Sequence, residues 1–417
     1  MAGLTLSWLI LMLRQFPCRA QVQPFSAMCY TDITALYGAR GLSEGKIPYL
    51  DTPLEYPVLT GGLVELARRI SGLLGAKSGP NLPGDVTAHA SEVFFGVNAV
   101  LLFVLFGVLI WAHLRMARPE DAILIAIAPA IWTAGLINWD ALVVALASLA
   151  LLAWGRKRPA LAGVFIGLGT AAKLYPAFFF VPLVILCVRA GRWRELLRAL
   201  GAAVGVWLVV NVPVYLANPE NWSYFWQYNS GGRGGDLGSV WYVLSLAGFD
   251  IPNAASLWLV PLAVGFAAIC VLLALAPTRP RLAQGVFLVV AWFLIVNKVY
   301  SPQYVLWLLP LLILARPRWV DWIVFAVGET FYYACIWLYL DGALASGTGD
   351  QARIYWLSVV VRVGVQLWLC ARVAMDVWWP ETDIVRDAEL DDPNGGPLAS
   401  VPDAPWLDVL RRGAGAR

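Results

Sequence analysis

Residues 91–114, SEVFFGVNAVLLFVLFGVLIWAHL, decide the class of this fold. The stretch is apolar over the length that a helix needs to cross the hydrocarbon core of a bilayer, which is about 20 residues. Similar stretches recur along the 417 residues, which are 60% hydrophobic and only 14% charged, against about 25% charged residues in ordinary globular domains. The composition therefore excludes a soluble fold and predicts an all-α polytopic membrane protein.

Composition and motifs also exclude several functions. The formal net charge of +3 is too small to indicate a nucleic-acid partner. Two histidines and six scattered cysteines match no familiar zinc or haem framework. The chain has no Walker motif, no glycine-rich dinucleotide motif and no repeat of fixed period, so an ATP-driven pump gains no support.

The hydrophobic pattern predicts a bundle of about twelve transmembrane helices. They are placed near residues 3–15, 91–114, 121–136, 139–155, 159–172, 174–189, 198–216, 256–276, 282–298, 302–315, 319–340 and 354–378. The first is short and has no basic residue before it, which leaves open a shortened helix, a mis-assigned start or a signal-like segment. A retained helix is the preferred interpretation.

The basic residues predict the orientation of the bundle. One set of alternate loops holds thirteen: Arg115, Arg118, Arg156, Lys157, Arg158, Arg189, Arg192, Arg194, Arg198, Arg279, Arg281, Arg316 and Arg318. The opposite set holds only Lys173, Arg233, Lys298 and Arg353. The positive-inside rule places the first set and both termini in the cytoplasm, with large loops at 16–90 and 217–255 outside.

The predicted domain organisation follows from this topology. Residues 1–378 are predicted to form the transmembrane domain of a multi-pass cell-membrane protein. Residues 379–417 are rich in Pro, Gly and Asp, and they carry eight acidic residues against four arginines from Glu381 onward. This composition predicts a disordered cytoplasmic tail.

The first outer loop is too long for a passive connector, so we expect a folded element on the membrane surface. Within it, residues 58–74, VLTGGLVELARRISGLL, have the spacing of an interfacial amphipathic helix, which fits a membrane anchor and a role in lipid-substrate access equally well. Asp32 and Glu55 lie in the same loop. From spacing alone Asp32 fits a helix-terminal charge or cap, and Glu55 a solvated acid.

Basic residues of the outer side form a second group of candidates. AAKLYP (171–176) places Lys173 between two short spans, where snorkelling to the interface competes with anion binding. The second outer loop, ENWSYFWQYNSGGRGGDLGSVWYVLS (220–245), carries Arg233 among glycines and aromatics, a combination that suits a glycosylated lipid. NKVYSPQY (297–304) adds Lys298. The three basic side chains are candidates to converge on one phosphate.

Two buried features are expected to be structural. Glu329 and Arg362 fall near the middle of neighbouring spans, so we expect them to form an ion pair. Cys18 and Cys29 both lie in the first outer loop, where an oxidising compartment permits a disulfide without requiring one.

Five segments taken in order resemble the GT-C integral-membrane glycosyltransferases, and most nearly glycosyltransferase family 87, the polyprenol-phosphate-mannose-dependent mannosyltransferases. They are TDITALYGARGLSEGKIPYLD (31–51), EYPVLTGG (55–62), INWDALVVALASLALL (137–152), AAKLYP (171–176) and SPQYVLWLLPLL (301–312). No single segment is specific for this family. The ordered set is moderately specific, because each segment lies on the side of the membrane that the topology predicts. The resemblance implies a GT-C-like helical bundle with a large first extracytoplasmic loop.

The resemblance also implies roles for individual residues. It maps a catalytic base onto Asp32, through the D-x-x-x-x-Y and G-x-x-P-Y pattern of the first loop. It implies donor-phosphate contacts from Lys173, Arg233 and Lys298. The candidate substrate-binding residues are Tyr37, Glu55, Asp140, Gln303 and Tyr304.

The expected reaction is transfer of a sugar, mannose before arabinose, from a polyprenyl-phosphate donor to a lipid-linked or cell-envelope glycan acceptor on the extracytoplasmic face. A single displacement inverts the anomeric centre and needs a base and cations, with no metal and no cofactor. The expected partners are the donor, the acceptor and membrane lipids. The alternative is a lipid or sugar transporter or flippase, which the number of spans and the pair Glu329 and Arg362 would also fit.

Overall fold

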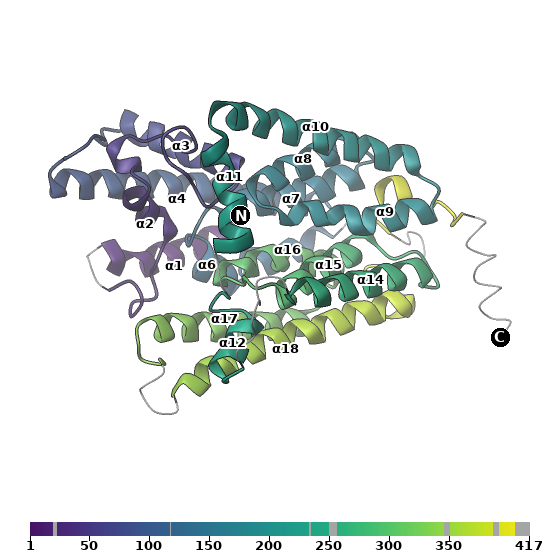
Figure 1. The fold of residues 1–417 in the computed structure, drawn as a ribbon. Helices are drawn as coiled ribbons and strands as arrows, with labels where there is room; N and C mark the ends of the chain where they lie inside the picture. The colour runs from purple at the N-terminus through teal and green to yellow at the C-terminus, as the bar shows by residue number, and fades with distance from the viewer. Residues whose placement is uncertain are drawn as a thin grey trace.

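A computed structural model of the chain describes residues 1–19, 23–116, 118–232, 235–249, 257–345, 351–386 and 392–404. These residues form helices and connecting loops, and no β-strand occurs among them. The axes of most of the long helices are roughly aligned, horizontally in Figure 1. In this view α2 and α3 lie at the left and the last described residues lie at the right. The all-helical prediction is confirmed.

The helices follow one another along the chain with short turns between some of them. Those of the first half are α1 (Ala2–Arg19), α2 (Asp32–Ala39), α3 (Val58–Leu73), α4 (Gly84–Leu114), α5 (Ala122–Ala126), α6 (Pro129–Ala134), α7 (Asp140–Gly155), α8 (Pro159–Ala172), α9 (Phe180–Arg189) and α10 (Trp193–Ala217). Those of the second half are α11 (Pro219–Gln227), α12 (Val240–Leu246), α14 (Leu259–Leu275), α15 (Leu282–Val296), α16 (Val305–Ala315), α17 (Trp319–Leu340) and α18 (Gln351–Trp378). The short helical turns are η1 (Leu42–Glu44), η2 (Pro119–Asp121), η3 (Tyr175–Phe179), η4 (Tyr228–Gly232), η5 (Pro302–Tyr304), η6 (Pro380–Thr382) and η7 (Gly396–Leu398).

Each predicted segment overlaps a helix, with several differences in extent. The segment 174–189 is η3 followed by α9, 302–315 is η5 followed by α16, and α10 begins at Trp193, five residues before the predicted 198. The segment 121–136 is two helices, α5 and α6, because Pro129 has no N–H for the helical ladder and starts a new helix as its first residue. Helix α4 begins at Gly84, seven residues before the predicted 91. Four helices, α4, α10, α17 and α18, are long and apolar enough to cross a membrane by themselves. The total number of crossings stays a prediction.

Helix α1 packs as an integral part of the bundle. Leu4 and Leu11 are fully buried, and the Ser7 hydroxyl donates to the carbonyl of Ala126 at 2.8 Å. Arg14 donates to the backbone carbonyls of Trp132 (2.9 Å) and Thr133 (2.8 Å). These contacts fix α1 against α5 and α6. Retention of the helix stays a prediction.

Small residues bring α8 and α10 into close contact. A Cβ atom added to Gly163 would lie 2.0 Å from the carbonyl oxygen of Ala199, and one added to Gly167 would lie 2.4 Å from that of Ala203. Glycine on one helix and alanine on the other, each spaced by four residues, let two backbones approach without side chains between them.

Apolar side chains also cover much of the outside of the bundle. On α10, Val209 and Leu216 are 72% and 73% exposed, and Val264 on α14 is 64% exposed. Continuous apolar surface of this kind is unfavourable in contact with water but not in contact with lipid. The described helices are therefore those of a membrane protein.

The end of the bundle opposite α2 and α3 is closed by buried arginines, and we refer to it as the arginine-rich end. Arg281 forms an ion pair with Asp383 at 2.7 Å, and Arg189 pairs with Asp403 at 2.6 Å. Both carboxylates belong to the segment that composition predicts to be a disordered tail. Residues 379–386 and 392–404 instead pack against the helix ends, because their acidic side chains pair with arginines that are distant in the sequence; residues 405–417 lie outside the described part.

The segment between α1 and α4 forms a folded element, as the length of the loop predicts. Helix α3 spans Val58–Leu73, close to the predicted 58–74. Cys18 and Cys29 form a disulfide with a Cα–Cα distance of 5.9 Å, which settles the pairing that the sequence leaves open. The bridge joins the end of α1 to the residues that precede α2.

Candidate active site

A pocket of about 440 Å³ lies where α2, α11, η5 and α17 approach one another. Five of the residues proposed from the sequence line it: Asp32, Glu55, Lys173, Gln303 and Tyr304. They come from four separate stretches of the chain. The fold therefore brings together residues that the sequence places up to 272 positions apart.

Asp32 is the first residue of α2, but it does not cap the helix. Thr31 is the cap, and its hydroxyl accepts a hydrogen bond from the Ile33 N–H at 3.2 Å. The Asp32 N–H donates to the carbonyl of Ile137 at 2.7 Å, which ties the start of α2 to the residues before α7. Because Thr31 does the capping, the Asp32 carboxylate is left to line the pocket, and the cap interpretation of Asp32 is wrong.

Two tyrosines hold the Asp32 carboxylate. The Tyr56 hydroxyl donates to Asp32 Oδ2 at 2.8 Å, and Tyr30 is a second hydrogen-bond partner. Burial raises the pKa of Asp32 above that of an ordinary aspartate, while the two hydroxyls and the positive charge of Lys173 partly oppose the rise. A carboxylate of raised pKa is a stronger base than a solvated one, and this suits proton abstraction from a hydroxyl.

Lys173 follows the last residue of α8, in extended conformation, and its ammonium group is surrounded by aromatic rings. Its Nζ lies 4.8 Å from the ring centre of Tyr56 and 5.3 Å from that of Tyr304. It also pairs with Asp140 Oδ1 at 3.1 Å. Lys173 thus faces the pocket from a fixed position, and the snorkelling alternative is not what the structure shows.

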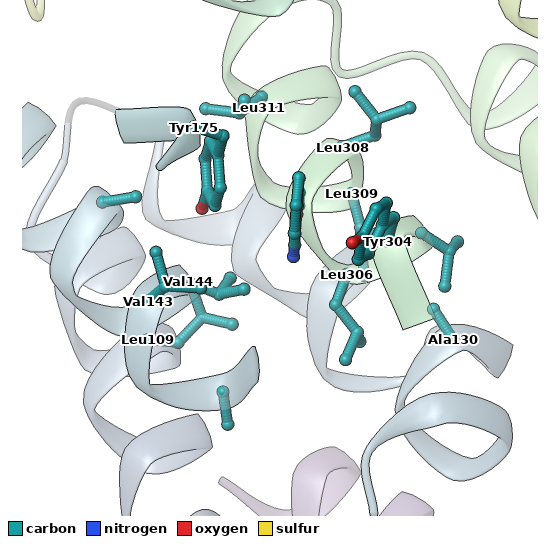
Figure 2. Packing of buried hydrophobic residues seen from close by; sticks show 14 of the residues in the cluster. Leu109, Ala130, Val143, Val144, Tyr175, Tyr304, Leu306, Leu308, Leu309 and Leu311 are labelled. Atoms are coloured by element: carbon teal, nitrogen blue, oxygen red, sulfur yellow. The ribbon is translucent and has the colours of Figure 1, made fainter. Parts of the chain in front are cut away.

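Asp140 lies behind Lys173 and not in the pocket wall. The residue is 2% exposed, and its Oδ2 accepts a hydrogen bond from Trp307 Nε1 at 2.9 Å. The Trp307 ring is stacked between Tyr175 (ring centres 4.5 Å apart) and Tyr304 (3.9 Å). Figure 2 shows Tyr175 and Tyr304 in this packing, among the leucines of α16. Asp140 therefore positions Lys173 and Trp307 and has no direct access to a ligand.

Glu55 reaches the pocket as part of a link between the two large loops. Arg40 Nε donates to Glu55 Oε2 at 2.8 Å, and the same guanidinium donates to the Tyr224 hydroxyl of α11 at 3.3 Å. The Glu55 carboxylate is 19% exposed and borders the pocket. The Glu55 carboxylate is therefore accessible from the pocket.

A second pocket, of about 300 Å³, adjoins the first and is mainly apolar. The two share the side chains of Lys173, Phe225, Asn229 and Tyr304 as a common wall. Lys298 lines the second pocket, and its Nζ donates to the carbonyl of Ser230 at 3.0 Å. A ligand with a charged head and a long apolar tail fits this pair of pockets, with its head at the shared wall.

The predicted pair of Glu329 and Arg362 is confirmed, and it supports the residues that carry Gln303. Arg362 Nε lies 3.0 Å from Glu329 Oε2, and its guanidinium donates to the carbonyls of Tyr300 (3.2 Å) and Ser301 (3.3 Å). Gln303 lines the first pocket and is 7% exposed; its side-chain Oε1 has no hydrogen-bond partner among the described residues. A buried amide oxygen without a partner is costly, so Gln303 is an unusual residue of the pocket wall.

Two further predictions, for Tyr37 and Arg233, have different outcomes. Tyr37 is 2% exposed and stacks on Phe94 with ring centres 4.6 Å apart, so it belongs to the packing behind α2 and not to the lining of either pocket. Arg233 lies outside the described residues. Within the described ranges, no group of three or more His, Cys, Asp or Glu side chains is arranged to hold a metal ion.

The sequence profile of glycosyltransferase family 87 matches residues 87–302, more than half of the chain. The chain belongs to glycosyltransferase family 87. It is therefore a membrane glycosyltransferase, and the resemblance drawn from the five segments is confirmed at the level of the family. No curated protein matches the chain at a significant level.

The family 87 match includes Lys173 and Lys298 but ends before Gln303 and begins after Asp32. Asp32 is joined to the matched region through contacts, since its backbone bonds to Ile137 and Tyr56 bonds to Asn138 at 3.3 Å. The segment between α1 and α4 thus adds the Asp32 carboxylate to a pocket whose other walls come largely from the matched part of the glycosyltransferase.

Sequence reasoning missed several residues of this glycosyltransferase pocket. Tyr30 and Tyr56 both hold Asp32, and each stands beside a proposed residue in the sequence. Asp236 also lines the pocket, and its Oδ2 accepts a hydrogen bond from the Ser301 hydroxyl at 2.9 Å. An aromatic hydroxyl next to a candidate base and an acid within a glycine-rich loop are the available signals, but neither is distinctive without the fold.

Proposed function

We propose that the protein transfers a sugar, mannose before arabinose, from a polyprenyl-phosphate donor to a lipid-linked or cell-envelope glycan acceptor. The transfer takes place on the extracytoplasmic face, with both termini in the cytoplasm, and inverts the anomeric centre. Asp32 is the general base, and Lys173 and Lys298 bind the donor phosphate. Glu55, Gln303 and Tyr304 contact the substrates.

One observation carries this proposal. Asp32 and Lys173 line the same pocket, and both contact Tyr56, one through its hydroxyl and the other through its ring face. A base for the acceptor hydroxyl and a cation for the leaving phosphate are the two groups that glycosyl transfer from a lipid phosphate requires. Their placement around one aromatic side chain supports the assignment of both roles.

The proposed reaction is a single displacement. Asp32 accepts the proton of the acceptor hydroxyl while the hydroxyl oxygen forms a bond to the anomeric carbon. The bond from that carbon to the phosphate oxygen breaks on the opposite face, and the electron pair leaves with the polyprenyl phosphate. Lys173 and Lys298 stabilise the negative charge on this phosphate, and the apolar pocket takes the prenyl chain. Because the donor carries its own activated leaving group, we expect no metal or cofactor.

The transporter alternative gains less support. Transporter sites lie near the bilayer midplane between repeats, whereas Asp32 and Glu55 reach this pocket from the segment between α1 and α4. Membership of a glycosyltransferase family also favours transfer.

Sugar transfer from radiolabelled polyprenyl-phosphate-mannose into membrane lipids tests the proposal. Asp32→Asn is expected to lower the rate by about 10²- to 10⁴-fold, the usual contribution of a general base. Glu44→Gln is the matched control, because Glu44 is an exposed carboxylate of the same loop that lines neither pocket.

The outcomes separate the parts of the proposal. Labelled product with wild type and with Glu44→Gln, but not with Asp32→Asn, supports the donor and the base together. Full activity of Asp32→Asn removes Asp32 from the mechanism. No product with any variant contradicts mannose and calls for polyprenyl-phosphate-arabinose.

A further inference from the structure

A second concentration of charge lies at the arginine-rich end, away from the candidate active site. Arg115, Arg156 and Arg158 line a groove of about 480 Å³ between the ends of α4, α7 and α8. We refer to it as the arginine groove. None of its lining residues belongs to either of the pockets described above.

The other residues that line the groove are apolar. Leu149, Leu152 and Phe165 are among the apolar side chains that line it. Trp111 and Leu161 lie at the groove and are 47% and 37% exposed. A tryptophan next to arginines at a helix end is typical of the level of the lipid headgroups.

The arginines of the groove have no carboxylate partners in the described ranges. Arg156 donates to the backbone carbonyl of Arg115 at 2.9 Å, and the Arg115 guanidinium lies 5.5 Å from the ring centre of Trp111. The neighbouring acids Glu120 and Asp121 pair with another residue, Arg118, at 3.6 and 2.6 Å. No Asp or Glu of the described chain lines the groove.

This differs from the other arginines of the same end. Arg189, Arg281 and Arg316 each form an ion pair with an aspartate of the chain. The three arginines of the groove are instead exposed, and no described carboxylate compensates their charge, so their guanidinium groups are available to an anion.

We infer that the arginine groove binds the phosphate headgroup of an anionic phospholipid. The guanidinium groups offer forked donors that match phosphate oxygens, and the apolar lining continues into the region of the acyl chains. A free phosphate ion would use the arginines but not Leu152, Leu161 or Phe165. The inference does not rest on the proposed reaction, because the groove is separate from the catalytic pocket.

Phosphatidylglycerol with a fluorescent acyl chain, titrated with the full chain in detergent micelles, tests the inference through fluorescence anisotropy. The double variant Arg115→Gln with Arg156→Gln is expected to bind about thirtyfold more weakly, from about fivefold per arginine near a membrane surface. Arg158→Gln alone is expected to lose about fivefold. The matched control, Arg194→Gln with Arg198→Gln, removes two exposed arginines of α10 outside the groove and should bind as wild type does.

Three results would overturn the inference. The first is that phosphatidylcholine carrying the same fluorophore binds as tightly as phosphatidylglycerol. The second is that the two double variants lose affinity equally. The third is that inorganic phosphate displaces the lipid at equal concentration. The melting temperature of each variant checks that it is folded. If Arg115→Gln with Arg156→Gln does not fold, the single variant Arg158→Gln still tests the inference.

Discussion

Tyr56 is the residue on which the candidate active site is centred. Its hydroxyl donates to Asp32, its ring faces the Lys173 ammonium group, and Asn138 donates to its oxygen. Burial and the nearby carboxylates raise the pKa of Tyr56 well above that of a free tyrosine, so it stays protonated and acts as a donor. Its hydrogen bond can therefore orient the Asp32 carboxylate and favour its ionised form, against the effect of burial.

We expect Tyr56→Phe to change the pH dependence of transfer. The Tyr56 hydrogen bond lowers the pKa of Asp32, so its loss raises that pKa further above the ordinary value. Asp32 acts as a base only when ionised, and activity is lost as the pH falls through its pKa. The acid limb of kcat/KM should therefore move to higher pH, with recovery of rate at alkaline pH.

The control for this change is Tyr215→Phe, because Tyr215 is an exposed residue of α10 outside both pockets. Its acid limb should match that of wild type. A fall in the rate of Tyr56→Phe that is equal at every pH would instead assign Tyr56 a purely structural role.

Lys173 is expected to act on the donor. Lys173→Met removes the cation at the wall shared by the two pockets, so kcat/KM for the polyprenyl-phosphate donor should fall by about 10²- to 10³-fold, as for loss of one group that stabilises developing charge. Lys173→Arg should retain part of the activity because it keeps the charge. Steady-state kinetics with each substrate varied in turn measures the effect.

Lys77→Met is the control for this variant, since Lys77 is exposed and lies outside both pockets. A rise in the KM for the acceptor, with the donor kinetics unchanged, would move Lys173 to the acceptor side of the reaction.

At the scale of single residues, the sequence predicted five lining residues of the pocket but not how they are held. Asp32, Lys173 and Gln303 stood out because ionisable and polar groups at helix junctions are unusual in an apolar chain. Tyr37 was wrongly grouped with them, since helical spacing gives the same face for a packed ring and for a ligand contact. The hydrogen bond from Tyr56 to Asp32 joins a loop residue to the first residue of α2, 24 positions away, and no local pattern encodes it.

At the scale of elements, the contact between α8 and α10 gives a sharp expectation. Gly163→Ala should destabilise the protein by about 1–3 kcal/mol, because the new methyl group would lie 2.0 Å from the Ala199 carbonyl and force the helices apart. Gly205→Ala on α10 meets nothing within 4 Å and should be neutral or slightly stabilising, since alanine favours helix. Thermal unfolding in detergent measures both, and equal melting temperatures would contradict the close packing.

The positions of helices were predictable because lipid demands long apolar runs, and each such run became a helix. The first and last residues of the helices were less predictable. Helix α4 begins seven residues early, since polar residues such as Asp85 and Thr87 are compatible with a helix that extends past the apolar run. The break between α5 and α6 is visible in the sequence as Pro129, but hydropathy alone does not register it.

At the scale of the whole molecule, the two ends of the bundle differ in the charged side chains that they carry. One end carries the pocket with Asp32, and the other is closed by arginines paired with aspartates from residues beyond α18. Composition could not predict this closure, because the partners of Asp383 and Asp403 lie more than 100 residues away in the sequence. An acidic segment stays solvated only when its carboxylates have no buried cation with which to form an ion pair.

We expect Asp383→Ala to test this closure. Arg281 is 2% exposed, and it would keep its bonds to the carbonyls of Leu314 and Ala315 but lose its only carboxylate partner among the described residues. A buried charge left without its partner costs about 3–5 kcal/mol, so the melting temperature should fall clearly. Glu381→Ala, an exposed acid two residues earlier, should leave it unchanged; equal effects of the two variants would contradict a specific role for the pair.

The bridge between Cys18 and Cys29 changes the connectivity of the chain close to Asp32. It closes a covalent ring that begins at the end of α1 and ends three residues before Asp32. A protease that cuts one peptide bond inside this ring releases nothing, because both fragments stay attached through sulfur. Only reduction of the disulfide would then separate α1 from the segment that carries the proposed base, so under oxidising conditions a nicked molecule and an intact one keep the same covalent attachment at this point.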